Sequence, residues 1–171
     1  MPLELVPVRC LTDNYAWLLH GNGQTALIDA PEAAPILAEL AARGWSLDLI
    51  ALTHHHDDHI QAVPDLVAMT GAQVMGNARD AARLPGLDIA IRPGETVEIC
   101  GEPAQVIDVS GHTVGHIAFH LPQSAMAFTA DSLMALGCGR LFEGDAPMMW
   151  ASLSRLNALP AQTLICSGHD Y

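Results

Sequence analysis

Four histidines and two aspartates occupy six consecutive positions of the sequence, from His54 to His59. Alternate side chains of an extended segment point the same way, so His54 and His56 can bind one cation. Asp58 and His59 would then turn toward a second cation. A solvated histidine loop is the alternative, but this cluster is internal and directly follows an apolar stretch. The segment therefore predicts a metal site that serves two ions.

Three more segments carry metal-ligand residue types where predicted strands end. Each alone is a weak indication, because a lone histidine after a strand is more often structural and a lone aspartate more often caps a turn. Together with the histidine cluster, in this order, they are specific. The segments are Ser110–His116, Thr129–Ser132 and Ser167–Asp170.

The elements that must position these segments alternate between strands and helices. Gly21–Gln24 has the residue types of a tight hairpin turn. Helices are predicted where apolar residues recur at helical spacing between Pro and Gly boundaries. The predicted strands are 3–8, 15–20, 25–29, 47–53, 73–76, 104–109, 117–121, 125–129 and 163–166, and the predicted helices are 31–44, 60–70, 78–84 and 148–159. This order indicates sheets covered by helices, with the chemistry in loops that follow strands.

Composition narrows the class of protein. A chain of 171 residues that is half apolar can fill one core, so one compact domain is expected. No apolar run approaches the roughly 20 residues of a membrane-spanning helix, and the start has no secretory signal, so we expect a soluble, cytoplasmic protein without a membrane partner. The four cysteines are scattered and are expected to be free thiols. A net charge of -12 argues against binding nucleic acid.

The order His-x-His-x-Asp-His, Gly-His-Thr-x-Gly-His, Asp and Gly-His-Asp-Tyr resembles the metallo-β-lactamase superfamily from the first strands to the last residue. Leu11–Tyr15, Phe128–Leu133 and Gly137–Gly144 resemble its glyoxalase II (hydroxyacylglutathione hydrolase) branch. The resemblance implies an α/β (α+β) fold, an αββα sandwich, with residues 1–171 forming the catalytic domain and metals at one edge of the sheets. The C-terminal helical domain that binds glutathione in the family is expected to be absent after Tyr171.

The resemblance also assigns roles to individual residues. It places His54, His56 and His112 on one metal and Asp58, His59 and His169 on the other, with Asp131 bridging both. The catalytic carboxylates would be Asp58 and Asp131. His116 would support a ligand by a hydrogen bond. Asp29 stands at the end of a predicted strand, and this position favours a residue that braces the ligand loop over a metal ligand. Substrate contacts are expected from Arg140, Phe142 and Tyr171, whereas His55 is expected to point away from the metals and His20 and His120 to be structural.

The reaction that the resemblance implies is thioester hydrolysis. Two divalent metals, zinc by preference with iron or manganese as alternatives, would lower the pKa of a shared water from about 16 to near 7. The resulting hydroxide would attack a glutathione thioester such as S-lactoylglutathione, in methylglyoxal detoxification. The leaving thiol has a pKa of about 8.5, so it needs little protonation. We expect a monomer or a weak homo-oligomer.

Other functions remain open on the sequence. A persulfide dioxygenase of the same superfamily would use one iron and a related ligand set, but Gly137–Gly144 favours the hydrolase. Another hydrolase of the same fold is possible on the ligand pattern alone, although the acidic charge disfavours a nuclease and the missing export signal disfavours a β-lactamase. A truncated, non-catalytic metal-binding domain is disfavoured because all seven ligand positions are occupied.

Overall fold

Two mixed β-sheets form the centre of the molecule in a computed structural model that describes all residues, 1–171. The first sheet has the order β1-β2-β3-β4-β5-β6 and the second the order β11-β10-β9-β8-β7. The strands of the first sheet are β1 (Glu4–Cys10), β2 (Asn14–Gly21), β3 (Gln24–Ile28), β4 (Leu49–Ala51), β5 (Gln73–Asn77) and β6 (Ile89–Ile91). Those of the second are β7 (Thr96–Ile99), β8 (Glu102–Asp108), β9 (Ile117–Leu121), β10 (Met126–Ala130) and β11 (Leu164–Ser167).

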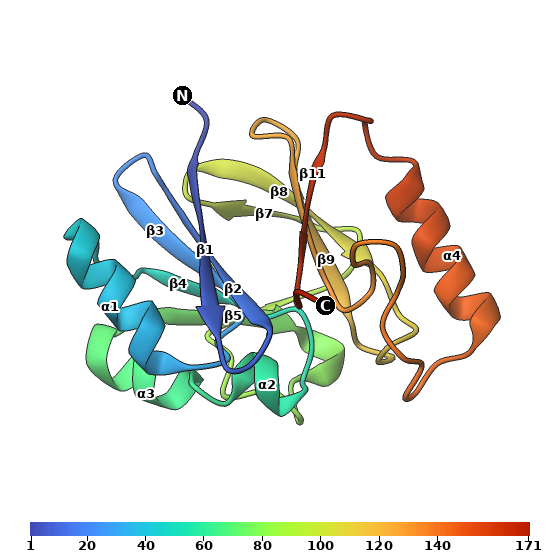
Figure 1. Cartoon of the computed structure of the whole chain (residues 1–171), viewed down its shortest axis with the longest axis horizontal. Coiled ribbons are helices and arrows are strands. Elements are labelled where there is room, and N and C mark those ends of the chain that lie inside the picture. Colours follow the sequence, from blue (N-terminus) through green and yellow to red (C-terminus); the bar gives the residue numbers. More distant parts are fainter.

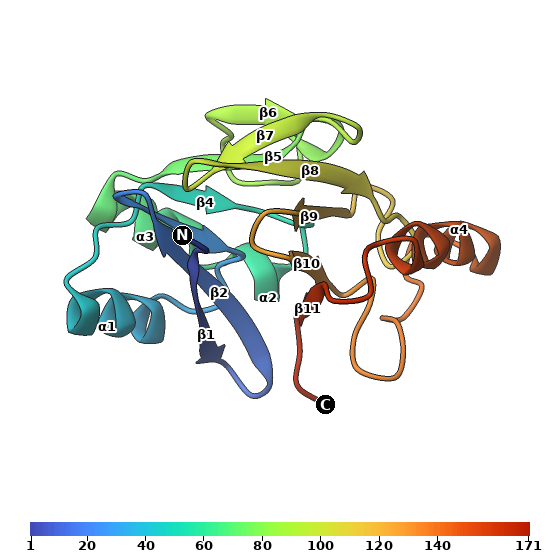
Figure 2. The same ribbon diagram turned by 90° about the horizontal axis from the view of Figure 1, so that it is seen from above.

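Helices cover the two outer faces, which gives the predicted αββα sandwich. Figures 1 and 2 show α1 (Ala33–Arg43) and α3 (Val63–Thr70) on one side of the molecule and α4 (Ala146–Asn157) on the opposite side. One cluster of 18 buried residues joins the first sheet to α1 and α3, and one of 17 fills the space between the sheets. The predicted fold class is therefore confirmed. No helix has the length and apolar content needed to cross a membrane.

Local sequence explains several of these elements. Asn22 and Gly23 both adopt positive φ, 51° and 74°, and close the hairpin between β2 and β3 as predicted. In α1, Ile36 and Leu40 lie one turn apart on the buried face, and Gly44 ends the helix with a left-handed φ of 67°. The strands β9 and β10 are buried at every position, because helices or the other sheet cover both of their faces.

One predicted helix was wrong, and two strands were missed. The predicted helix over 78–84 is only a short 3-10 turn, η1 (Ala78–Asp80). The helix predicted over 60–70 is present as α3, which begins at Val63 and, as predicted, ends at Gly71, and the separate short helix α2 (Asp57–Ile60) precedes it. Residues 89–91 and 96–99 form β6 and β7, which the sequence did not indicate. Both strands are short, and alternate residues of β7 are exposed and polar, so neither carries a strong apolar pattern.

Candidate metal centre

The histidine and aspartate segments meet at one edge of the sandwich. In the second sheet, β8, β10 and β11 run in the same direction, because β9 is antiparallel to both β8 and β10, and β11 is parallel to β10. Their carboxyl ends therefore lie at the same edge, and the segments with His112, Asp131 and His169 follow them. From the first sheet, β4 leads into the segment that holds His54 to His59.

The first group of predicted ligands is His54, His56, His112 and Asp131, whose candidate ligand atoms all lie within 4.8 Å of one another. His112 Nε2 lies 2.9 Å from His56 Nδ1 and 3.2 Å from Asp131 Oδ2. His54 Nε2 lies 4.0 Å from the same carboxylate oxygen. Three imidazoles and one carboxylate thus converge on one point.

The second group is Asp58, His59 and His169, again with candidate ligand atoms within 4.8 Å. The Nε2 atoms of His59 and His169 lie 3.6 Å and 3.4 Å from Asp58 Oδ2. Asp57 and Asp58 stand in the first turn of α2, where carboxylates interact favourably with the positive end of the helix.

Asp131 connects the two groups. Its Oδ2 lies 3.2 Å from His112 and 3.3 Å from His169, and its Oδ1 lies 3.4 Å from His59. The backbone directly before it is unusual: Ala130 has φ 43°, and the pairing of β10 with β11 shifts register between Phe128 and Ala130. Such a bulge re-aims the side chain that follows.

The residues present fit a metal ion. His54 Nε2, His59 Nε2 and Asp131 Oδ1 are buried and have no hydrogen-bond partner, which is costly unless another group satisfies them. A side chain at Gly168 would place its Cβ 2.4 Å from Asp131 Oδ1, so only glycine leaves this carboxylate in position. Neutral imidazoles with carboxylates are a typical donor set for zinc, iron or manganese.

Neighbouring groups fix which ring nitrogen faces the centre in several of these histidines. Asp29 Oδ2 accepts from His59 Nδ1 at 2.8 Å, and Asp29 also accepts from the backbone and hydroxyl of Thr53. Thr53 Oγ1 in turn lies 2.9 Å from His54 Nδ1. Asp29 could itself form a cluster with His54 and His59, but its oxygens are occupied by these bonds. Asp29 thus orients the ligand segment.

Further orienting groups come from residues to which the sequence gave no orienting role. Asp13 Oδ1 lies 3.0 Å from His169 Nδ1, and buried Asn14 donates to both the backbone and the side chain of Asp58 at 3.0 Å. The carbonyl oxygen of Arg140 lies 2.7 Å from His112 Nδ1. Asp13 and Asn14 belong to Leu11–Tyr15, a segment that resembles the family. That resemblance is the signal from which a role for these two residues could have been predicted.

The remaining histidines have other surroundings. His116 stacks on His54 with ring centroids 4.5 Å apart, and its Nε2 accepts from the backbone N–H of Asp131 at 3.3 Å. His55 lies outside both groups, 3.5 Å from Asp80 and 3.4 Å from Glu143. His20 and His120 bond to Thr25 and Gln105, away from the centre.

Burial and ion pairing set the charge of these groups in the metal-free protein. Burial lowers the pKa of His54 well below its usual value and that of His116 to about 3, so both rings are neutral. Burial also lowers the pKa of His59, but the neighbouring carboxylates of Asp131 and Asp29 outweigh it and raise the pKa to about 10. For Asp131, burial raises the pKa, yet the neighbouring imidazoles of His112, His169 and His59 hold it far below the usual range.

An open cleft of about 750 Å³ exposes this centre to solvent. Arg140, Phe142 and Tyr171, the predicted substrate contacts, all line it. Phe142 meets the rings of His56 and His112 edge-on, and Arg140 lies over the Phe142 ring at 5.7 Å. Tyr171 stacks on His169, with ring centroids 5.2 Å apart. The other lining residues are His56, Asp57, Asp58, His112, Asp131, Met134, Cys138, Gly139 and His169.

An αββα sandwich with histidines and aspartates gathered at the carboxyl ends of its strands defines a class of metal-dependent enzymes. The family model described as Metallo-beta-lactamase superfamily matches residues 11–169. A hydroxyacylglutathione hydrolase of Fuscovulum blasticum is 67% identical over all of this chain and 68% of its own length. One from Ruegeria pomeroyi is 61% identical with the same coverage.

Solved structures agree with this class. ETHE1 from Myxococcus xanthus matches with a TM-score of 0.85 and 31% identity, covering 100% of this chain and 76% of its own. TTHA1623 in a di-iron-bound form matches with a TM-score of 0.84 and 28% identity over 98% of this chain and 92% of its own. The chain belongs to the metallo-beta-lactamase superfamily and, within it, to the hydroxyacylglutathione hydrolase (glyoxalase II) family. It is a hydrolase with a metal-binding centre.

Proposed function

We propose that the chain hydrolyses S-(2-hydroxyacyl)glutathione, with S-lactoylglutathione as the representative substrate, to glutathione and a 2-hydroxy acid. In the cell this would complete the detoxification of methylglyoxal. The observation that carries the proposal is the Asp131 carboxylate, which lies within 3.4 Å of histidines from both ligand groups at the base of an open cleft. The names of relatives that are 61% and 67% identical support the substrate class.

The proposed cofactor is a pair of divalent metals, zinc by preference, with iron and manganese as alternatives. His54, His56 and His112 would hold one ion, Asp58, His59 and His169 the other, and Asp131 would contact both. The related TTHA1623 binds two irons, which supports the number two. When bound, such ions supply Lewis acidity and a water of lowered pKa at neutral pH.

The chain's own residues would orient the ligands and the substrate. Asp29, Asp13 and the Arg140 carbonyl hold the ring nitrogens that face away from the centre, so the rings cannot rotate out of position. The neutral form of buried His54 leaves its Nε2 lone pair available. The thiol leaving group has a pKa of about 8.5, so the reaction requires no acid from the chain.

Substrate binding would depend on local groups in the cleft. A glutathione thioester is anionic, and the net charge of -12 opposes it. Arg140 is the cation that lines the cleft, and we propose that it contacts a glutathione carboxylate. Phe142 and Tyr171 would then pack against the peptide part of the substrate.

Two measurements on one purified sample test this function. We expect close to two transition-metal ions per chain by elemental analysis and hydrolysis of S-lactoylglutathione by the same sample. One iron per chain, with oxygen uptake on a persulfide and no thioester hydrolysis, would instead identify the dioxygenase. Metal without either activity would identify a non-catalytic metal-binding domain.

The cellular setting remains a prediction. The four cysteines are free, and burial raises the pKa of the Cys10 thiol to about 11 and that of Cys166 to about 12, which makes these thiols unreactive. Free thiols of this kind support the cytoplasm as the compartment. We also propose a monomer or weak homo-oligomer. The composition described above argues against nucleic-acid and membrane partners.

A further inference from the structure

A polar cluster behind the histidine segment joins three parts of the chain that are distant in sequence. Arg83, just after η1, forms ion pairs with Asp80 and with Glu143. Its Nη2 lies 2.6 Å from Asp80 Oδ1 and 3.3 Å from Glu143 Oε2, and its Nη1 also bonds Glu143 Oε1. One guanidinium thus bridges two carboxylates.

The cluster reaches the segment of predicted metal ligands through His55. This ring lies between the carboxylates, 3.5 Å from Asp80 Oδ2 and 3.4 Å from Glu143 Oε1, and 3.3 Å from Arg83 Nη1. Its neighbours His54 and His56 point into the metal centre. The cluster therefore lies directly behind the ligands without belonging to either ligand group.

Glu143 ties the cluster to the segment 139–144, which carries Arg140 and Phe142 on the wall of the cleft. Its Oε2 accepts from the backbone N–H of Val114 at 2.7 Å. The same segment is held by backbone bonds from Phe142 to His112 and from Gly144 to Gly111, at 3.2 Å and 3.0 Å. Glu143 is the one side chain of the segment that reaches an ion-pair partner.

Close packing fixes the position of Asp80 in this cluster. Asp80 is buried, and a Cβ on Gly115 would lie 2.0 Å from Asp80 Oδ2, so the carboxylate occupies space that only a glycine leaves free. Gly115 belongs to the Gly-His-Thr-x-Gly-His motif. That motif therefore provides a ligand, His112, and also the space for Asp80.

We propose that Arg83 is a positioning residue, which acts through Glu143 to hold the segment 139–144 and its cleft-lining side chains against the metal centre. This inference rests on the proposed function only for its effect on substrate. Removing the guanidinium leaves Asp80 and Glu143 repelling each other, so the segment should loosen. A looser wall weakens substrate contacts in the ground and transition states alike, which raises KM and leaves kcat nearly unchanged.

The test compares Arg83→Ala, Arg83→Lys and Arg79→Ala as metal-loaded proteins. Arg79 is the matched control, because it is an exposed arginine of the same turn and its side chain makes no ion pair. For Arg83→Ala we expect faster amide exchange and faster tryptic cleavage after Arg140, located by mass spectrometry. We also expect a KM for S-lactoylglutathione that is about threefold to tenfold higher, with metal content retained.

Arg83→Lys should give exchange rates, cleavage rates and a KM between those of Arg83→Ala and the unaltered chain. One ammonium keeps the charge but cannot bridge both carboxylates as a planar guanidinium does. Arg79→Ala should match the unaltered chain in all three measurements. A lower melting temperature of Arg83→Ala with unchanged exchange in 139–144 would overturn the proposal, and so would loss of metal or an equal effect of Arg79→Ala. If the unaltered chain hydrolyses no thioester, the proposed function fails, while exchange and cleavage still decide the role of Arg83.

Discussion

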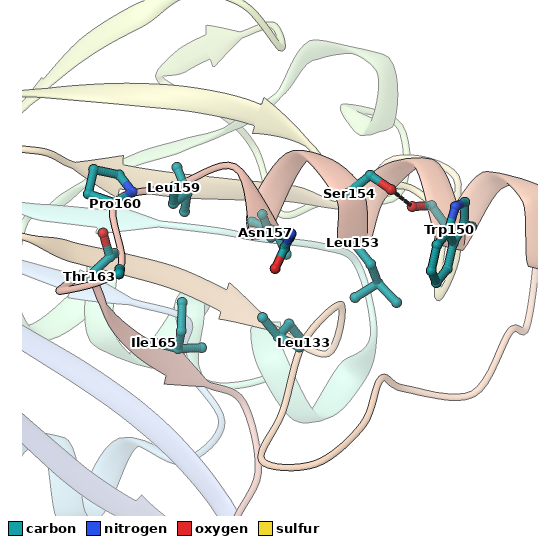
Figure 3. Close-up of a pocket in the computed structure, with 11 residues that line it drawn as sticks. Leu133, Trp150, Leu153, Ser154, Asn157, Leu159, Pro160, Thr163 and Ile165 are labelled. Carbon is teal, nitrogen blue, oxygen red and sulfur yellow. Dashed lines mark hydrogen bonds between the residues drawn. The ribbon is translucent and has the colours of Figure 1, made fainter.

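The two outer faces of the sandwich differ in how completely helices cover them. On the first sheet, α1 and α3 share a cluster of 18 buried residues with the strands. On the second sheet, α4 contributes to a cluster of only three, Val109, Ala118 and Leu156. Beside α4 lies a groove of about 620 Å³, with Leu133, Leu153 and Ile165 on its walls (Figure 3). Trp150 at its rim is 73% exposed.

This difference indicates that one side of the molecule mainly provides stability and the other mainly provides the metal ligands. The first sheet and its helices bury most of the apolar surface outside the central layer, so they should contribute most to the free energy of unfolding. The second sheet contributes His112, Asp131 and His169 from the ends of its strands, while its strands β7, β8 and β11 keep exposed residues. Substitutions on the first sheet and its helices should therefore mainly lower stability. Substitutions at the strand ends of the second sheet should mainly lower metal binding and activity.

The largest effect is expected from Asp131→Ala on the catalytic side. This change removes the carboxylate that lies between the two ligand groups, so metal content and thioester hydrolysis should both fall, the latter by at least about a hundredfold. His55→Ala is the comparison, because His55 lies in the same region but outside both ligand groups. Equal losses of metal in the two variants, by elemental analysis, would refute the assignment of ligands.

On the helix-covered face, Leu66→Ala should lower the free energy of unfolding by about 2 to 5 kcal/mol, because Leu66 in α3 is fully buried and its loss leaves a cavity. Leu153→Ala, in the groove beside α4, should cost less than about 1.5 kcal/mol, since this side chain is only half-buried. Chemical denaturation measures the free energy of unfolding of both variants. Similar costs at the two positions would show that the two faces contribute equally to stability.

Within the cleft, Arg140→Ala should raise KM for S-lactoylglutathione about tenfold with kcat nearly unchanged, because it removes one charged contact to the substrate. Arg92→Ala, an exposed arginine outside the cleft, serves as the control. Steady-state kinetics measure KM and kcat separately for each variant. A fall in kcat without a change in KM would mean that Arg140 acts on the reaction itself.

The last prediction concerns the pH dependence of stability. In the metal-free protein the pKa of His59 is raised to about 10 from an ordinary value of 6.5. The folded state therefore binds this proton more tightly, and its contribution to stability is complete below about pH 6.5 and is lost as the pH rises through about 10. Denaturation with chelator present should show that decline, and Asp29→Asn should reduce it. An identical decline in both proteins would exclude the His59–Asp29 pair as its origin.

The sequence alone determined the kinds of ligand, their order and their place after strands. Apolar runs that end in His54 to His59, in Asp131 or in His169 can be recognised locally, because burial and strand geometry act over a few residues. The alternation of elements indicated sheets covered by helices, and the resemblance to the family implied the αββα layering. The short strands β6 and β7 were missed, because pairing with neighbouring strands stabilises them and their own apolar pattern is weak.

Only the tertiary structure decided which of these residues meet and how they are aimed. Asp29 and Asp131 both follow strands, yet Asp29 bonds Thr53 and His59 from behind, whereas Asp131 enters the centre through a bulge at the end of β10. The contacts of Asp13, Asn14 and Arg83 likewise join segments far apart in the chain. Such distances depend on strand register and sheet packing, which local sequence patterns do not specify.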